Sequence, residues 1–173
     1  ALTMQDYPNA AQYAKTAIEL TKKQGHALME GDQLMCGFAN ITSDTKEAMY
    51  AAMTPNDQTV YFYSFYAYMS WNFNSSAIRQ GVKCINAETY DTMSETDERR
   101  KWWDPSGEAE VPGSAYAKNI YQNRKFTARS TADAVGDVAF MRLAEMYLIR
   151  AEALARAGDP AAQDVFTAFQ KTR

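Results

Sequence analysis

The sequence has 173 residues, of which 46% are hydrophobic and 23% are charged, with a formal net charge of −3. A chain of about this length forms one domain of ordinary size and buries roughly two-thirds of its unfolded surface. The mixed charge and slight acidic excess exclude the basic stripe of a nucleic-acid-binding surface, so no nucleic-acid partner is expected. Its apolar runs are all shorter than the roughly eighteen residues that span a bilayer.

The first predicted element is an amphipathic helix over residues 8–24. Pro8 suits the first helical turn, and Gly25 is a natural C-terminal cap. Lys22 and Lys23 suit the negative end of the helix dipole. One face of this helix is predicted to be buried, because apolar and small residues recur on it at helical spacing: Ala10, Tyr13, Ala14, Ala17, Ile18 and Thr21.

Residues from about 35 to 130 show no sustained helical period, so they are predicted to form a long irregular excursion. Within it, the aromatic run 60–71 fits a short strand or a buried irregular segment equally well. A short helix is predicted from about Ala87 to Met93. The Pro- and Gly-containing stretch 104–113 is predicted to be a surface loop.

Two charged stretches of the excursion are also distinctive. Asp97 is predicted to cap a turn, with Arg99 and Arg100 close to its carboxylate. Residues 116–129 are polar and basic, and they are interpreted as an extended part of the excursion.

The last forty residues predict a helical hairpin. Asp137 is the expected N-cap of a helix over 137–157, whose buried stripe comprises Met141, Ala144, Leu148, Ala151 and Ala155. Gly158 ends this helix, and Asp159-Pro160 opens a second helix over 160–171 that is expected to bury Ala162, Val165, Phe166 and Phe169. Such a hairpin cannot bury its own apolar face, so it implies stacked helical neighbours.

The stretch Gly136–Ala153, which reads GDVAFMRLAEMYLIRAEA, resembles the recurrent helix of the SusD/RagB proteins. Residues 10–20, 68–72 and 96–103 are similar to further segments of that family. The resemblance implies a mainly α fold of tetratricopeptide-like helical hairpins with long irregular excursions. Members of the family are longer and begin with a signal peptide and a lipidated cysteine. Residues 1–173 are therefore interpreted as a single SusD-like domain fragment, from the interior or C-terminal half of such a protein.

The same resemblance implies a function. The expected role is noncatalytic binding of a nutrient glycan at the bacterial outer membrane, by a surface-exposed lipoprotein that serves polysaccharide utilisation. The expected partner is a SusC-like TonB-dependent transporter, which would take up the captured ligand. Two alternatives stay open: a RagB-like protein that binds an oligopeptide, and a helical-repeat adaptor that binds other proteins.

Aromatic residues make up 13% of the chain and are the candidate ligand-binding residues. A flat ring suits a sugar because the C–H face of a pyranose is apolar, although packing in the core is the commoner use of such rings. In an extended segment, alternate residues would lie on one face, and neighbouring Asn72 and Asn74 would supply amide hydrogen bonds. The candidates are Tyr66, Tyr68, Trp71, Trp102 and Trp103.

Few residues suggest catalysis or metal binding. His26 is the only histidine and is expected to be solvated, and the sequence has no nucleophile elbow, zinc-protease motif or phosphate loop. An enzyme, a metal site and a cofactor are therefore not expected. A glycosidase carboxylate pair stays open as an alternative, because no sequence motif marks such a pair. Cys36 and Cys84 fit either one disulfide or two buried free thiols. Arg142 and Glu145 are interpreted as structural anchors.

Overall fold

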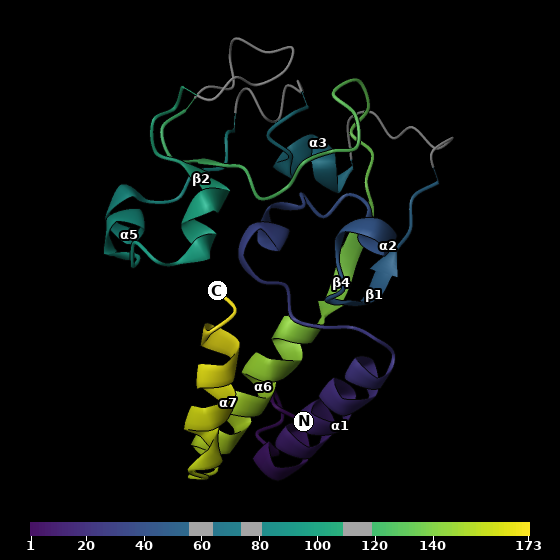
Figure 1. Cartoon of the computed structure of the whole chain (residues 1–173), viewed down its shortest axis with the longest axis vertical. Coiled ribbons are helices and arrows are strands. Elements are labelled where there is room, and N and C mark those ends of the chain that lie inside the picture. The colour runs from purple at the N-terminus through teal and green to yellow at the C-terminus, as the bar shows by residue number, and fades with distance from the viewer. Residues whose placement is uncertain (56–63, 74–80, 109–118) are drawn as a thin grey trace. The chain divides into compact units, whose positions relative to one another are not determined.

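The structure is a computed structural model that describes residues 1–55, 64–73, 81–108 and 119–173. These residues form two compact units (Figure 1). Unit 1 comprises residues 1–30, 46–51 and 139–173, and unit 2 comprises residues 31–45 and 52–138. The predicted mainly α fold is confirmed, since the longest elements among the described residues are helices of 10 to 17 residues, whereas the strands there have two to five residues.

Helix α1 (Tyr7–Lys23) agrees with the predicted first helix to within one residue at each end. The Asp6 side chain caps it by accepting a hydrogen bond from the backbone N–H of Asn9. Gly25 follows the helix with φ +87°, a conformation that favours glycine. Of the predicted face, Ala10, Ala14, Ile18 and Thr21 are buried. Ala17 is half-buried, and Tyr13 is 65% exposed.

Strand β4 (Val138–Arg142) occupies the stretch that was predicted to open the helix of 137–157. It pairs with β1 (Ala48–Ala52) in a two-stranded sheet. The helical prediction for 137–142 is therefore wrong. Local periodicity could not detect a strand partner that lies about ninety residues earlier in the chain. The helix itself, α6 (Leu143–Arg156), begins only after the strand ends.

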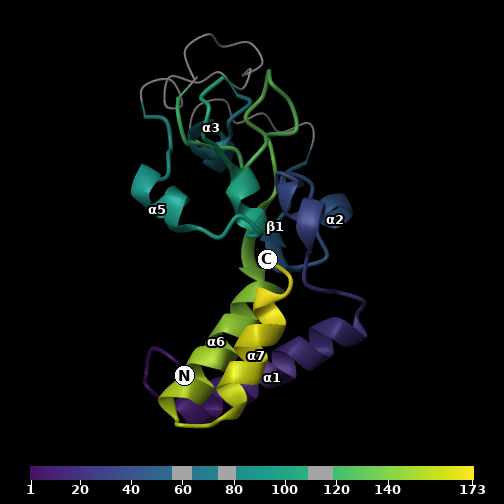
Figure 2. The same ribbon diagram turned by 60° about the vertical axis from the view of Figure 1, so that its left-hand side comes forward.

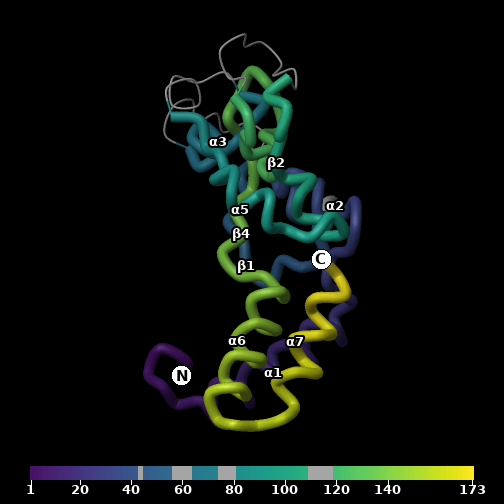
Figure 3. Tube along the Cα trace, turned by 90° about the vertical axis from the view of Figure 1, so that its left-hand side faces the viewer, coloured from purple at the N-terminus to yellow at the C-terminus, as the bar shows by residue number. Residues whose placement is uncertain are grey.

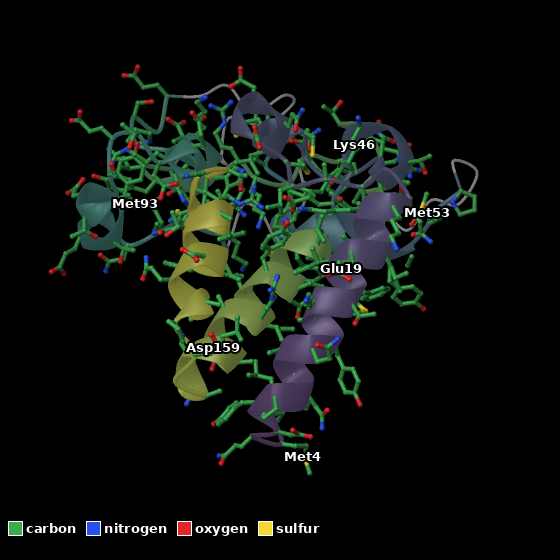
Figure 4. The ribbon with its side chains drawn as sticks, turned by 60° about the horizontal axis from the view of Figure 1, so that its bottom comes forward. Met4, Glu19, Lys46, Met53, Met93 and Asp159 are labelled. Carbon is green, nitrogen blue, oxygen red and sulfur yellow. The ribbon has the colours of Figure 1, made fainter. Side chains whose placement is uncertain are left out.

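Helix α7 (Ala161–Gln170) follows α6 after a tight turn, and the two helices pack side by side as predicted (Figure 2). Gly158 adopts φ +72° in the turn, and the Asp159 carboxylate accepts a hydrogen bond from the Ala161 N–H (2.9 Å; Figure 4). Within unit 1, the N-terminus lies beside this turn, whereas the C-terminus lies at the far end of α7 (Figure 3).

The buried face of α6 differs from the predicted stripe. Ala144 and Ala151 are buried as predicted, but Leu148 is 42% exposed, Met141 is 41% exposed and Ala155 is also exposed. Leu143, outside the predicted stripe, is fully buried. Because α6 packs against both α1 and α7, the positions of those two helices decide which side is covered. The predicted burial of Phe166 on α7 is likewise wrong, since its side chain is 39% exposed. The core of unit 1 comprises Ile18, Leu143, Met146, Tyr147, Ala151 and Val165.

A buried carboxylate joins the non-helical parts of unit 1. Glu47 is fully buried, and its Oε1 accepts hydrogen bonds from the Met29 N–H (2.8 Å) and from the Arg173 guanidinium (2.6 Å). Its Oε2 lies 3.5 Å from a guanidinium nitrogen of Arg142. Arg142 is therefore an anchor, as predicted, although its partner is Glu47. Glu145 on the same helix is exposed.

Unit 2 consists of short elements joined by irregular backbone. In the part of unit 2 that the structure describes, the helices are α2 (Ile41–Asp44), α3 (Phe65–Met69), α5 (Ala87–Thr92) and the 3-10 turns Gly31–Met35 and Glu98–Trp102. Strands β2 (Trp103–Asp104) and β3 (Gln122–Asn123) pair antiparallel. The predicted short helix near 87–93 is confirmed as α5, and residues 65–69 are helical instead of extended. Residues 60–63 of the aromatic run lie outside the described residues.

Asp137 has a different role from the predicted helix cap. It is 2% exposed and lies in unit 2, where its carboxylate accepts hydrogen bonds from the backbone N–H groups of Ile41 (3.0 Å) and Thr54 (2.8 Å) and pairs with Arg129. A buried carboxylate with this number of donors is compensated for its loss of hydration. Asp137 thus holds together backbone segments that are distant in sequence.

Asp97 caps a turn as predicted. Its carboxylate accepts hydrogen bonds from the Arg99 N–H (2.9 Å) and from the Arg99 guanidinium. The guanidinium beside it holds the pKa of Asp97 below its ordinary value. The two cysteines are free, with Cys36 half-buried and Cys84 exposed, so the predicted burial is wrong for Cys84. No helix among the described residues is long and apolar enough to cross a membrane.

Candidate functional site

Tyr66 lies in the core of unit 2. Its side chain is 1% exposed, and its hydroxyl donates a hydrogen bond to the backbone oxygen of Asp137 (2.9 Å). The ring of Phe65 meets it edge-on at a centroid distance of 5.3 Å, and Gly136 lies so close that a Cβ atom there would be 2.4 Å from the tyrosine ring. With its ring enclosed in this way, Tyr66 packs the core and presents no face to a ligand.

Tyr68 stands on the opposite side of the same helix. Ser64 caps α3 by accepting a hydrogen bond from the Ala67 N–H (3.1 Å), which fixes the start of the helix. Residues two apart in an α-helix point about 200° apart, so Tyr66 and Tyr68 do not share a face as they would in a strand. Tyr68 is 43% exposed and its ring is open to solvent.

Trp71 is half-buried and its ring is held in place at the pyrrole edge. Its Nε1–H donates to the Thr127 hydroxyl (2.9 Å), and its backbone N–H donates to the Phe126 oxygen (3.1 Å). The guanidinium of Arg124 lies over the indole, 4.5 Å from a ring centroid. Both the orientation and the surroundings of this ring are therefore set by the segment 124–127.

Trp102 is held by hydrogen bonds to Leu34 and to the same segment 124–127. Its Nε1–H donates to the backbone oxygen of Leu34 (2.8 Å), and its own backbone oxygen accepts from the Arg124 N–H (2.6 Å). The ammonium of Lys125 lies 4.4 Å from the ring centroid. Trp103 follows in β2, is half-buried, and pairs with Asn123.

Residues 122–127 thus bring together candidates that are thirty residues apart in sequence. Trp71 contacts one part of this segment and Trp102 another, and consecutive residues Arg124 and Lys125 place a cation over each ring. We call these four residues the tryptophan–cation cluster. The sequence analysis did not select the two cations, although the basic composition of 116–129 was a signal for them.

The asparagine beside the aromatic run does not face solvent. Asn72 is 6% exposed, and its amide donates to the Ala128 oxygen (2.9 Å) and accepts from the Ala128 N–H (2.8 Å). This amide therefore fixes the backbone next to the cluster and is not available for a sugar. Asn74 lies outside the described residues.

The described residues show little that would support other chemistry. In them, no group of three or more His, Cys, Asp or Glu side chains is arranged to hold a metal ion. His26 is half-buried, against the predicted solvation, and its Nδ1 donates to the backbone oxygen of Lys46 (2.9 Å). Cys84 is exposed, but partial desolvation by its neighbours raises the pKa of its thiol, which favours the unreactive protonated form.

The fold is similar to solved structures of bacterial carbohydrate-binding proteins. A SusD-like carbohydrate binding protein from Bacteroides vulgatus is 23% identical with a TM-score of 0.62, and the match covers 94% of this chain and 34% of that one. Surface glycan-binding protein A from Bacteroides fluxus is 18% identical with a TM-score of 0.63, covering 97% of this chain and 42% of that one.

A third solved structure contains a sugar. It is surface glycan-binding protein A from Bacteroides thetaiotaomicron in complex with laminarihexaose, which is 14% identical with a TM-score of 0.52. The match covers 96% of this chain and 44% of that one. The chain therefore spans less than half the length of these relatives. Identities this low show a shared fold and leave the ligand open.

A search of curated proteins gives no match. The model of the SusD family, in contrast, matches residues 4–173, which is nearly the whole chain. The match includes α1, the aromatic segments of unit 2 and the β4–α6–α7 stretch, in agreement with the resemblance noted from residues 136–153. The chain belongs to the SusD family.

Proposed function

We propose that this chain is part of a noncatalytic glycan-binding protein of the bacterial cell surface. The observation that carries the proposal is the match of the SusD family model to residues 4–173. The names of the similar solved proteins support it, since they describe surface glycan binding and one of them holds laminarihexaose. The slightly acidic net charge gives no support to a nucleic-acid ligand.

The geometry of unit 2 supports tryptophan rings as the contact surface. Trp71 and Trp102 are half-buried, and each ring is fixed by a hydrogen bond from its Nε1. A ring that is already fixed loses little conformational entropy when a sugar stacks on it, so binding is favoured by preorganisation. Exposed Tyr68 and half-buried Trp103 complete the proposed site. Tyr66 is left out because it is buried.

The cellular setting is proposed from the family. The full-length protein would be lipid-anchored at the outer surface of the outer membrane, and it would deliver its ligand to a SusC-like TonB-dependent transporter for nutrient uptake. The described residues contain no metal-binding group, and the proposal requires neither a metal nor a cofactor. Co-purification of the full-length protein with a SusC-like transporter would test this partnership.

A binding array with Trp→Ala variants tests the proposal. The chain is applied to arrayed glycans and peptides, and hits are quantified by calorimetry for the wild type, Trp71→Ala and Trp102→Ala. We expect glycan binding that weakens by about tenfold in either variant, because stacking on an aromatic ring contributes an energy of order 1 kcal/mol or more. Tyr13→Ala, which removes an exposed ring from α1, is the matched control and should bind as the wild type does.

Other results of the same array would redirect the proposal. Binding of peptides without glycans would favour a RagB-like peptide-binding protein, and binding of neither would favour a protein–protein adaptor. Normal glycan affinity with a lowered melting temperature in both Trp variants would assign the two rings to packing alone. Release of shorter sugars from a bound oligosaccharide would contradict the noncatalytic assignment.

A further inference from the structure

Arg124 differs from the neighbouring arginines of unit 2 in its partners. Arg99 is paired with Asp97, and Arg129 is paired with Asp137. The guanidinium of Arg124, in contrast, makes no hydrogen bond or ion pair with any residue that the structure describes, and its contact is the ring of Trp71. It is nevertheless half-buried. Its N–H donors are therefore partly removed from water without a protein acceptor in the described ranges.

The contact with the Trp71 ring leaves the N–H donors of Arg124 available to a ligand. A guanidinium that lies over an aromatic ring has one face covered, while its N–H groups point outward in its own plane. That fork matches the two oxygens of a carboxylate or sulfate, and such charge-assisted pairs are stronger than neutral hydrogen bonds. A sugar that bears an anionic group and contacts Trp71 would meet this fork.

Lys125 adds a second positive charge at the next position of the segment. Its ammonium lies 4.4 Å from the Trp102 ring centroid, and it is also near the rings of Phe38 (5.6 Å) and Phe126 (5.1 Å). Lys83 joins the segment through its backbone, since its oxygen accepts a hydrogen bond from the Asn123 N–H (2.7 Å), while its ammonium donates to the Gly81 oxygen (3.0 Å). The chain as a whole is acidic, so this gathering of cations is local.

From this arrangement we infer that the ligand of the tryptophan–cation cluster is an acidic glycan, one whose sugars carry carboxylate or sulfate groups. The inference rests on the proposed glycan-binding function and deepens it by naming the class of sugar. The tryptophans would supply a stacking surface common to many sugars, while Arg124 and Lys125 would select for negative charge. Selectivity of this kind depends on complementary charge.

Paired probes that differ only in charge test the inference. Hexagalacturonate is compared with its methyl ester, and sulfated maltohexaose with unsulfated maltohexaose, by calorimetry on the full chain. We expect one charged probe to bind at least about tenfold more tightly than its neutral counterpart, because a tenfold difference in affinity corresponds to roughly the net free energy of one charge-assisted hydrogen bond. The pair that shows the difference identifies carboxylate or sulfate as the anionic group.

An Arg124→Gln variant ties the selectivity to the cluster. It should lose most of the preference for the charged probe, so that the charged and neutral probes bind the variant with similar affinities. Arg156→Gln is the matched control, because Arg156 also lies over an aromatic ring, that of Tyr7, but its side chain is 56% exposed and belongs to unit 1. Raising the ionic strength of the solution from about 0.01 M to about 1 M should weaken the binding of the charged probe to the wild type more than that of the neutral probe. This test needs no variant.

The possible failures are distinguishable. Equal affinity for charged and neutral probes, or an unchanged preference in folded Arg124→Gln, would overturn the acidic-glycan inference and leave glycan binding in place. Salt-independent binding of the charged probe would also overturn it. Binding of none of the four probes, together with no hit on the glycan array, would overturn the proposed function and the inference with it.

Discussion

Truncating two leucines of α6 to alanine separates its buried face from its exposed face. Leu143 is 0% exposed and lies in the core of unit 1, whereas Leu148, five residues later, is 42% exposed. The chemical change is identical at both positions, and both lie in the same helix, so the small gain in helix propensity from alanine is shared. The difference between the two variants therefore reports burial.

The expected magnitudes follow from that burial. Full burial of a leucine side chain contributes about 1.5–3 kcal/mol, and the cavity left in a closed core raises the cost of Leu143→Ala to about 2–5 kcal/mol. Leu148 borders an open groove between α6 and α7, so its removal leaves no closed cavity. Leu148→Ala should therefore cost about 1 kcal/mol or less.

Urea unfolding followed by helical circular dichroism gives both free energies, by linear extrapolation to water. A cost of more than about 2 kcal/mol for Leu148→Ala would refute the assigned orientation of α6. So would a cost of less than about 1 kcal/mol for Leu143→Ala. Equal costs would mean that both faces of the helix are covered.

Three further predictions concern the polar and steric supports of the two units. Glu47→Ala removes the buried partner of the Arg173 guanidinium and should lower the free energy of unfolding by about 3–5 kcal/mol. Glu152→Ala, which breaks an exposed ion pair on α6, should change the free energy of unfolding by less than about 1 kcal/mol, and urea titration measures both values. Gly136→Ala places a Cβ against the Tyr66 ring and should destabilise unit 2, and the loss should be clearly smaller when Tyr66 is replaced by Leu. The melting temperatures of the two single variants and the double variant measure this coupling, and additive changes would contradict the contact. Because the folded pKa of Asp97 is depressed, its ion pair stabilises the fold above the unfolded pKa of about 3.9, and this stabilisation is lost as the pH falls through the folded pKa. Asp97→Asn should therefore reduce the dependence of the free energy of unfolding on pH, measured below about pH 5.

Local signals in the sequence were sufficient for α1, for the turn that joins α6 to α7, and for the family. The small and apolar residues of 8–24 recur at helical spacing, and Pro8 and Gly25 mark the ends, so α1 could be placed to within a residue. The Gly-Asp-Pro turn after α6 likewise depends on neighbouring residues alone. The family resemblance was read from residues 136–153, a continuous stretch, and the family model matches the chain around it.

The aromatic candidates could be listed from the sequence but not sorted. Tyr66 and Tyr68 are the same residue type two positions apart, yet one is 1% and the other 43% exposed. Their difference follows from α3 packing against Gly136, about seventy residues later. Likewise, nothing near Trp71 or Trp102 in the sequence indicates that Arg124 and Lys125 cover their rings.

The sequence by itself therefore determined α1, the turn between α6 and α7, and the family, because these depend on neighbours within a few positions along the chain. Only the tertiary structure decided that 138–142 is a strand, that Leu148 faces solvent and that Asp137 binds Ile41, Thr54 and Arg129 in place of capping a helix. Each of these outcomes depends on a partner that is distant in sequence. Hydrogen bonds and burial between such partners form in three dimensions, so no periodicity in the chain encodes them.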